Sequence, residues 1–401
     1  MHWPLGWRAG ALRAGLYPQK KNKKDLALFY SEVPARAAGV FTRSTVKAAP
    51  VLLSRMRLEA GAAKAVLLNS GCANACTGSR GLKDAGRCAG LAARSLGIPP
   101  RSVLLASTGV IGTFLPMKLL ERAIPALGAS LRGFGAGAKD GLEAARAIMT
   151  TDTRPKTASL QATVGGVRAA FWGCAKGAGM IHPRMATMLA VVLTDAAVAP
   201  RFLQGCLARA VEETFNRVSV DGETSTNDTV FLLANGAAGG PTIRNPQSPG
   251  AREFSRGVLE VCRRLSRQIA EDGEGASKSI WIFVEGARTK KEATRLAEAV
   301  AVSPLVKTAV YGADANWGRI MGAMGKTEIP FNPSRVEVRF GDYAVCRNGM
   351  EVPFDAKSAK KILNRPRVTL RIRLNQGKAW SHYQTCDFTG KYVDINAGYR
   401  S

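Results

Sequence analysis

The 401-residue sequence predicts an α/β protein with a smaller C-terminal unit. Three observations carry this prediction. Short apolar runs alternate with segments of helical periodicity along most of the chain. Two amphipathic helices are expected near the middle of the chain, and two strands with alternating side chains are expected near its end.

The expected helices follow one another between residues 200 and 300. The first begins after Pro200 and has apolar residues on related faces, at Phe202, Leu207, Ala210, Val211 and Phe215. The second begins near Arg252, and its apolar residues recur every three or four positions, at Phe254, Val258, Val261, Leu265 and Ile269. The third begins at Thr289, which together with Glu292 has the spacing of a capping box.

The expected strands lie in the last 70 residues. One strand alternates charged or polar residues with apolar ones, at Val368, Leu370, Ile372 and Leu374. Another repeats the pattern at Val336, Val338 and Phe340. Because both follow the polar loop at 309–320, we expect the smaller unit to begin after that loop, at residue 321.

Composition excludes several classes of protein. Hydrophobic residues make up 46% of the chain and charged residues 22%, which is typical of a globular protein with a large core. The longest apolar stretch without a charge, at 102–117, is too short and too polar for a transmembrane helix. Arg8 and Arg13 interrupt any secretory leader. We therefore expect a cytoplasmic protein that does not bind a membrane.

The formal net charge is +27, which first suggests a nucleic-acid partner. The basic residues, however, are spread over the entire chain, no nucleic-acid-binding motif is present, and aromatic residues make up only 7%. A solvated basic surface explains the pattern better. We do not expect nucleic acid as a partner.

Neither cysteine nor histidine suggests a metal site. The eight cysteines are dispersed singly, without a CxxC pair, and the three histidines (His2, His182 and His382) lie far apart. We therefore expect reduced thiols, no metal and no cofactor.

Five polar segments punctuated by glycine interrupt the apolar runs, at 67–78, 104–112, 148–153, 176–192 and 219–236. Each begins or ends at an expected buried strand, where catalytic groups are commonly held by a rigid scaffold. Any one of them is better explained as a simple turn, because Asn, Gly, Ser and Thr also form turns. Five such segments in one chain favour an enzyme.

The nucleophile is hard to assign to serine, because His182 and His382 are the only interior histidines and no GxSxG motif is present. A cysteine nucleophile is not excluded, but no cysteine has a convincing base beside it. The remaining economical design is a threonine that becomes N-terminal when the chain is cut, so that its own amine serves as base. Thr187, which follows the small Ala186 and opens an apolar run, suits this design.

The segment KGAGMIHPRMATML, residues 176–189, resembles the cleavage region of the ornithine acetyltransferase family, the bifunctional glutamate N-acetyltransferases of arginine biosynthesis. The resemblance extends over essentially the whole chain in the family order. It includes AAGVFTRSTVKAAPV, NSGCANA, STGVIG, MTTDT, VDGETSTNDTV, DGEGASK, ADANWGRI and the C-terminal INAGYRS. A series of such rare motifs is far more specific than any one of them.

The resemblance implies that the chain cuts itself between Ala186 and Thr187. It implies an α chain of residues 1–186 and a β chain of residues 187–401, in which 187–320 complete the main catalytic domain and 321–401 form the smaller unit. The implied fold is a four-layered α/β sandwich of the self-cleaving, aminopeptidase-like type. The implied assembly is a heterotetramer of two α and two β chains.

The implied reaction moves an acetyl group from N-acetylornithine to glutamate through an acetyl-threonine intermediate. By the same resemblance, Thr187 is the nucleophile, and Thr108 and Gly109 form the oxyanion hole. The residues that fall on substrate-binding positions are Thr153, Lys176, Thr187, Glu274, Asn396 and Ser401. Whether acetyl-CoA is a second donor is left open.

Glu274 is our candidate for the δ-ammonium of ornithine, on charge complementarity alone. Lys176, which precedes Gly177, has a less favoured alternative as a solvated loop cation. Ser401 stands where the family commonly has Thr, and Arg184 stands where Asn is frequent. Both departures leave the catalytic groups in place.

Two other functions compete with this one. A related self-cleaving hydrolase would pass its acyl group to water, and the distributed acetyltransferase motifs argue against it. A nucleic-acid-binding protein would leave the region around Thr187 unexplained.

Overall fold

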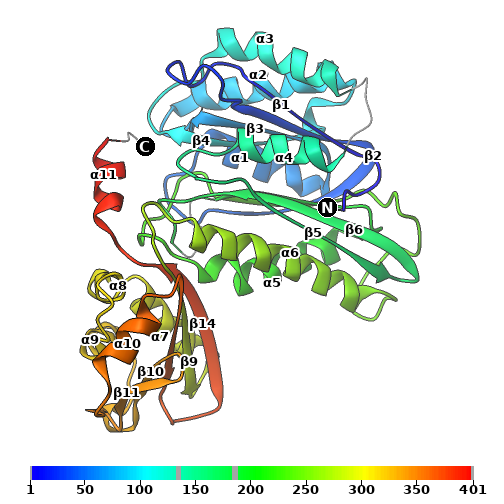
Figure 1. Cartoon of the computed structure of the whole chain (residues 1–401). Helices are drawn as coiled ribbons and strands as arrows, with labels where there is room; N and C mark the ends of the chain where they lie inside the picture. Colours follow the sequence, from blue (N-terminus) through cyan, green and yellow to red (C-terminus); the bar gives the residue numbers. More distant parts are fainter. Residues whose placement is uncertain (1, 132–136, 183–187, 399–401) are drawn as a thin grey trace.

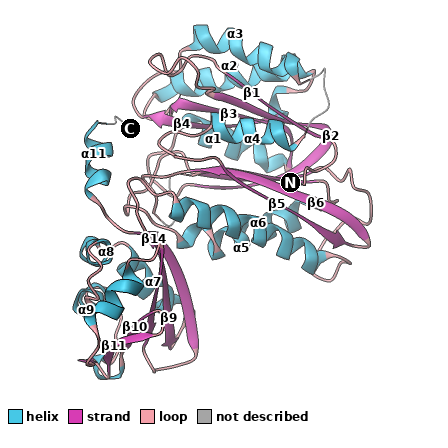
Figure 2. Ribbon diagram, viewed as in Figure 1, coloured by secondary structure: helices cyan, strands magenta, loops and turns pink. Residues whose placement is uncertain are grey.

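The computed structural model describes residues 2–131, 137–182 and 188–398 and contains a larger and a smaller unit, each built around its own sheet (Figure 1). Ala186, Thr187 and Ser401 lie outside the described residues. The α/β class expected from the sequence is confirmed (Figure 2).

Over its described residues, the larger unit is an eight-stranded sheet with six helices. Its strands are β1 (Trp7–Leu12), β2 (Leu26–Phe41), β3 (Ala62–Cys72), β4 (Val103–Val110), β5 (Lys156–Val164), β6 (Val167–Lys176), β7 (Leu189–Thr194) and β8 (Thr229–Ala234). Its helices are α1 (Ala49–Arg57), α2 (Gly78–Leu96), α3 (Met117–Ser130), α4 (Ala138–Ala147), α5 (Pro200–Glu213) and α6 (Ala251–Glu271). The strand order is β4-β3-β2-β8-β7-β6-β5, with β1 also paired to β2.

The long strand β2 belongs to two halves of this sheet. Its first part, 26–31, pairs with β1 and β3, and its last part, 36–41, pairs with β8. The ladder between β2 and β3 is irregular between Tyr30 and Ala35. One half contains β1, β3, β4 and the first part of β2, and the other contains β5 to β8 and the last part of β2. The two halves pack against each other, as the ring-centroid distance of 5.7 Å between Phe29 on β2 and Trp172 on β6 shows.

Alternating side chains of these strands separate the layers. On β2, Ala27 and Phe29 pack into the core between the two halves, whereas Leu26 and Leu28 pack under α1, α2 and α3. On β6, Trp172 enters the same inner core, whereas Phe171 packs under α5 and α6. The period of two in a strand therefore produces a sandwich of four layers, helix, sheet, sheet and helix.

The expected helices of the larger unit are confirmed. Apolar residues of α5 and α6 are buried against β5, β6, β7 and β8, among them Phe202, Leu207, Phe254, Val261 and Ile269. The basic residues Arg252, Arg256, Arg263 and Arg264 of α6 are exposed.

The smaller unit is a six-stranded sheet with helices on one face. Its elements are β9 (Ser279–Ala287), α7 (Lys290–Ala301), α8 (Pro304–Tyr311), α9 (Trp317–Gly325), β10 (Glu337–Phe340), β11 (Tyr343–Arg347), β12 (Met350–Glu351), α10 (Ala356–Leu363), β13 (Arg367–Arg373) and β14 (Ala379–Cys386). The strand order is β12-β11-β10-β13-β9-β14. The Thr289 side chain accepts a hydrogen bond from the Glu292 N–H and caps α7, as predicted.

The smaller unit begins earlier than the expected residue 321. Its strand β9 pairs in parallel with β13, from Ser279 opposite Arg367 to Glu285 opposite Arg373. The helices between them pack on this sheet as one core. Residues 279–320 therefore lie in the smaller unit, because the sheet needs β9 between β13 and β14.

The last helix, α11 (Gly390–Gly398), leaves the smaller unit and lies beside the edge of the larger one (Figure 1). All eight cysteines are free thiols. Within the described ranges, no helix is long and apolar enough to cross a membrane.

Candidate active site

A cavity lies in the larger unit where the ends of β4 and β6 meet the loops at 150–151, 221–227 and 274, and α11 covers one side of it. It contains about 680 Å³ of empty space, including its open mouth. Residues expected at the site from the sequence line it, namely Thr108, Gly109, Lys176, Glu274 and Asn396. These residues are separated by up to 288 positions, so only the fold brings them together.

Thr108 and Gly109 lie at the end of β4, which runs parallel to β3. Gly109 has a φ of +131°, and a Cβ there would overlap the backbone of Gly71 and Cys72 on β3, so only glycine fits. Asn227 stabilises the end of β4 that carries Thr108. Its side-chain amide donates to the carbonyl oxygens of Ser107 at 2.8 Å and Ala73 at 2.7 Å. The Thr108 hydroxyl is thereby held at the cavity wall.

Lys176 is the last residue of β6 and is only 3% exposed. Its Nζ donates to the Thr108 hydroxyl oxygen at 3.1 Å. Burial lowers the pKa of Lys176, and the nearby carboxylates of Asp152 and Glu274 oppose this shift. The structure thus places a buried ammonium at the site, and the alternative of a solvated loop cation is wrong.

Glu274 faces the same cavity and is 8% exposed. Its backbone N–H donates to the Ala178 carbonyl at 2.8 Å, and its Oε2 accepts from the Asn396 amide of α11 at 2.9 Å. A Cβ at Gly179 would overlap the Glu274 carboxylate at under 3.0 Å. Glycine at 179 therefore leaves the space that the carboxylate occupies.

The cavity has further lining residues that we did not single out from the sequence, among them Thr150, Thr151, Asp221 and Glu223. Asp221 accepts from the N–H groups of Met180 at 2.5 Å and Ile181 at 2.9 Å, and burial raises its pKa. All of these residues fall within polar segments that the sequence marked. Residue type did not distinguish the inward-facing members of each segment from their neighbours.

Thr153 does not line the cavity. It is exposed, and its N–H and hydroxyl donate to the Asp272 carboxylate behind the site. The cavity residues of the segment MTTDT are instead the preceding Thr150 and Thr151. The position of Thr153 therefore gives no support to the expectation that it contacts substrate.

The cleavage residues Ala186 and Thr187 and the terminal Ser401 lie outside the described residues, and the described chain resumes at Met188. The Met188 N–H donates to Asp228 Oδ1 at 3.0 Å. Asp228 is fully buried, and burial raises its pKa well above the usual range. It directly follows the cavity residue Asn227, so Met188 is fixed next to the cavity wall.

The described lining combines one ammonium, on Lys176, with three carboxylates, on Asp221, Glu223 and Glu274. Hydroxyls and amides supply neutral donors and acceptors. Such a lining suits a small ligand that carries both carboxylate and ammonium groups. Over the described part of the chain, no group of three or more His, Cys, Asp or Glu residues is arranged to hold a metal ion.

Comparison with known proteins identifies the relatives of this chain. The model of the ArgJ family matches residues 8–401. The arginine biosynthesis bifunctional proteins ArgJ of Symbiobacterium thermophilum and Desulfotalea psychrophila are each 46% identical to it over 398 residues. These matches cover 99% of this chain and 98% and 99% of the relatives. The crystal structure of the arginine biosynthesis bifunctional protein of Bacillus halodurans is 39% identical, with a TM-score of 0.50, over 51% of this chain and 96% of the solved one. The chain described here therefore belongs to the ArgJ family.

Proposed function

We propose that this protein is a glutamate N-acetyltransferase that moves an acetyl group from N-acetylornithine to glutamate, through an acetyl ester on Thr187. The observation that carries the proposal is the convergence of Thr108, Lys176 and Glu274 on one cavity whose wall also anchors Met188, the residue after Thr187. Met188 directly follows Thr187 in the sequence.

The nucleophile is made by self-cleavage between Ala186 and Thr187, which gives chains of 186 and 215 residues. The new Thr187 amine, with a reference pKa of about 8, then serves as the base for its own hydroxyl. The length of the solved Bacillus halodurans chain supports this step. About half of this chain, 51%, covers 96% of that chain, as expected if members of the family are cut in two.

In the first half-reaction, Thr187 Oγ gives its proton to the Thr187 amine and attacks the acetyl carbonyl carbon. The tetrahedral intermediate carries a negative oxygen, which the Thr108 hydroxyl and the Gly109 N–H stabilise. The carbon–nitrogen bond breaks, the amine of ornithine takes the proton, and ornithine leaves. The acetyl group stays on Thr187 as an ester.

In the second half-reaction, the α-amine of glutamate attacks this ester and loses a proton to the Thr187 amine, and the threonine hydroxyl is restored. Lys176 is suited to the α-carboxylate that both substrates share. Glu274 is suited to the δ-ammonium of ornithine, and Asn396 holds Glu274 by its amide. Thr153 and Ser401 enter this assignment from the family resemblance alone.

The relatives are named bifunctional. We propose that acetyl-CoA is the second acetyl donor, which would acylate Thr187 in the same way and release the thiol of CoA. We further propose that two α and two β chains assemble and act in the cytoplasm. Mass photometry, which weighs single assemblies, tests the heterotetramer directly.

An acetyl-exchange assay tests the reaction. The purified protein is incubated with N-acetylornithine labelled in the acetyl group, and glutamate is either added or omitted. We expect labelled N-acetylglutamate with glutamate present and little free acetate without it. Acetate released at the same rate in both samples would instead identify a hydrolase, and no turnover of the donor would contradict the proposal. A parallel sample with labelled acetyl-CoA as sole donor tests the second donor.

A further inference from the structure

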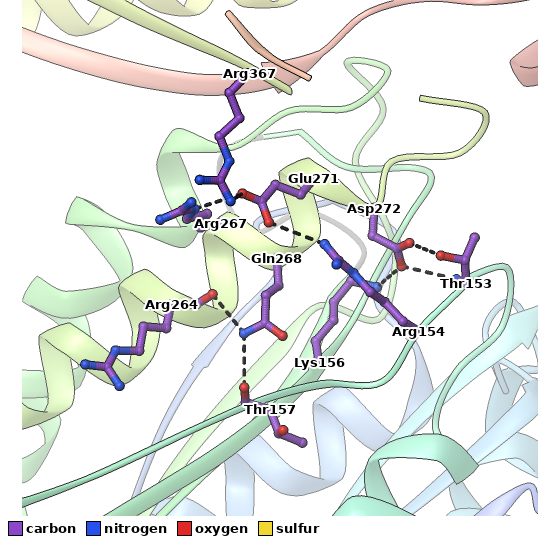
Figure 3. A network of polar contacts seen from close by, with 10 residues as sticks. All are labelled: Thr153, Arg154, Lys156, Thr157, Arg264, Arg267, Gln268, Glu271, Asp272 and Arg367. Atoms are coloured by element: carbon purple, nitrogen blue, oxygen red, sulfur yellow. Dashed lines mark hydrogen bonds and ion pairs between the residues drawn. The ribbon is translucent and has the colours of Figure 1, made fainter. Parts of the chain in front are cut away.

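A buried ion cluster, formed by Lys156, Asp152 and Asp272, lies behind the cavity. Lys156 begins β5 and is fully buried. Its Nζ lies 2.5 Å from Asp152 Oδ1. It also lies 2.5 Å from Asp272 Oδ2 (Figure 3). Both carboxylates are buried as well. Of the described residues that line the cavity, none belongs to this cluster.

Asp152 connects the cluster to two segments of the cavity wall. Its Oδ1 accepts from the Gly177 N–H at 2.7 Å, directly after Lys176. Its Oδ2 accepts from the Thr150 N–H at 3.0 Å, where the turn at 150–151 meets the cavity. The position of Asp152 therefore fixes the backbone that presents Lys176.

Asp272 connects the cluster to a third segment. Its carboxylate accepts from the Thr153 N–H at 3.1 Å and from the Thr153 hydroxyl (Figure 3). It lies two residues before Glu274, whose own N–H donates to Ala178. The ammonium of Lys156 thus joins the segments that carry Lys176 and Glu274 to each other.

Stability alone explains such a cluster poorly. Removing charges from water costs several kcal/mol per ion, and well-packed apolar residues often replace a buried ion pair without loss of stability. The carboxylate of Asp152 nevertheless stays charged. Burial alone would raise the pKa of Asp152, but the neighbouring ammonium groups of Lys156 and Lys176 lower that pKa to about 2. Apolar side chains in place of Asp152 and Asp272 would leave the N–H groups of Gly177, Thr150 and Thr153 without these acceptors.

We propose that Lys156 is a positioning residue for the transfer reaction. Its ammonium fixes Asp152 and Asp272, and through them it sets Lys176 and Glu274 at the separation that the substrates require. The inference rests on the proposed function, because the substrates are those of the acetyl transfer.

The sharpest test compares two adjacent carboxylates at the end of α6. Asp272 points into the cluster, whereas Glu271 points outward to Arg154, Arg267 and Arg367 (Figure 3). For Asp272→Asn we expect the KM for N-acetylornithine to rise about fivefold or more, with kcat changed by less than about threefold. For Glu271→Gln we expect both constants to stay at the wild-type values.

A second comparison separates positioning from stability. Lys156→Met leaves two buried carboxylates uncompensated and is expected to lower the melting temperature. Leu296→Ala, in the core of the smaller unit, lowers it by packing alone. At a temperature where both variants are folded, we expect KM for both substrates to rise about tenfold or more in Lys156→Met only, with partial recovery in Lys156→Arg.

The inference is overturned if Lys156→Met loses stability but keeps its KM values, or if Asp272→Asn behaves like Glu271→Gln. Should Lys156→Met fail to fold, the comparison at 271 and 272 decides alone. A wild-type protein without acetyl exchange would overturn the proposed function and this inference together. An active wild type with unchanged variants would overturn the inference only.

Discussion

Gly179 gives the sharpest mutational test of the cavity. A Cβ at this position would lie under 3.0 Å from the carboxyl carbon and both oxygens of Glu274, a separation that real Cβ atoms essentially never show. An ordinary contact needs 3.4 Å or more, so the carboxylate in Gly179→Ala must move by about 1 Å. A misplacement of about 1 Å costs up to about 100-fold in rate, so we expect kcat/KM for N-acetylornithine to fall about 10- to 100-fold. This is a loss of about 1.4 to 2.8 kcal/mol of transition-state stabilisation, although no charge has been removed.

Gly205→Ala is the matched control. Gly205 lies within α5, and a Cβ there would meet nothing within 4 Å. The same chemical change should therefore leave kcat/KM unchanged and slightly increase stability. The assay is steady-state acetyl transfer to glutamate, with intact mass measured in parallel so that incomplete chain cleavage is not mistaken for poor binding. Equal constants for Gly179→Ala and Gly205→Ala would refute the assigned place of Glu274 in catalysis.

Other predictions concern single groups. Glu274→Gln should raise the KM for N-acetylornithine, because the δ-ammonium loses its counter-charge; an unchanged KM would remove Glu274 from that role. Thr108→Val should lower kcat about 100- to 1,000-fold through loss of an oxyanion donor, and a wild-type kcat would exclude the hydroxyl from the oxyanion hole. Burial lowers the pKa of His382 from 6.5 to about 4, and the nearby charges of Arg217, Arg263 and Lys290 add to this shift. Below pH 6.5, protonation of this histidine therefore favours the unfolded chain. Stability should therefore fall as the pH drops from 6.5 towards 4, by at most about 1.4 kcal/mol per pH unit from this group. Urea unfolding at pH 7 and pH 5 should show that the free energy of unfolding depends less on pH in His382→Gln than in the wild type. The same change between the two pH values in both proteins would contradict the role given to His382.

Local patterns predicted the elements whose burial is periodic. Phe254, Val258 and Leu265 recur at helical spacing because one face of α6 packs on the sheet. Val368 and Leu370 alternate with polar residues because one face of β13 is covered by helices. In both cases the periodicity of the sequence reflects a single buried face.

The start of the smaller unit was not predictable in this way. Ser279 on β9 pairs with Arg367 on β13, 88 positions later, and a parallel pair of this kind leaves no local turn to mark it. The boundary expected at residue 321 was therefore wrong, although the alternating strands after it were right.

The motifs marked segments that line the cavity but did not show which of their side chains face it. Thr150, Thr151 and Thr153 have the same side chain within one turn, and only the first two line the cavity. Thr153 faces away from the cavity because its N–H donates to the Asp272 carboxylate. That carboxylate is in turn paired with Lys156. A lysine is ordinarily exposed, so nothing in the sequence marked Lys156 as buried.

The central claim, that Thr187 is a nucleophile made by chain cleavage, is tested most directly by the intact mass of the denatured protein. The wild type should give two chains of about 20 and 23 kDa, scaled by residue number from 42.6 kDa, the second starting at Thr187. The exposed control Thr163→Ala should be cut in the same way, and Thr187→Ala should remain a single chain. A single species of 42.6 kDa in the wild type, or a Thr187→Ala protein that is still cut at this position, would contradict the account.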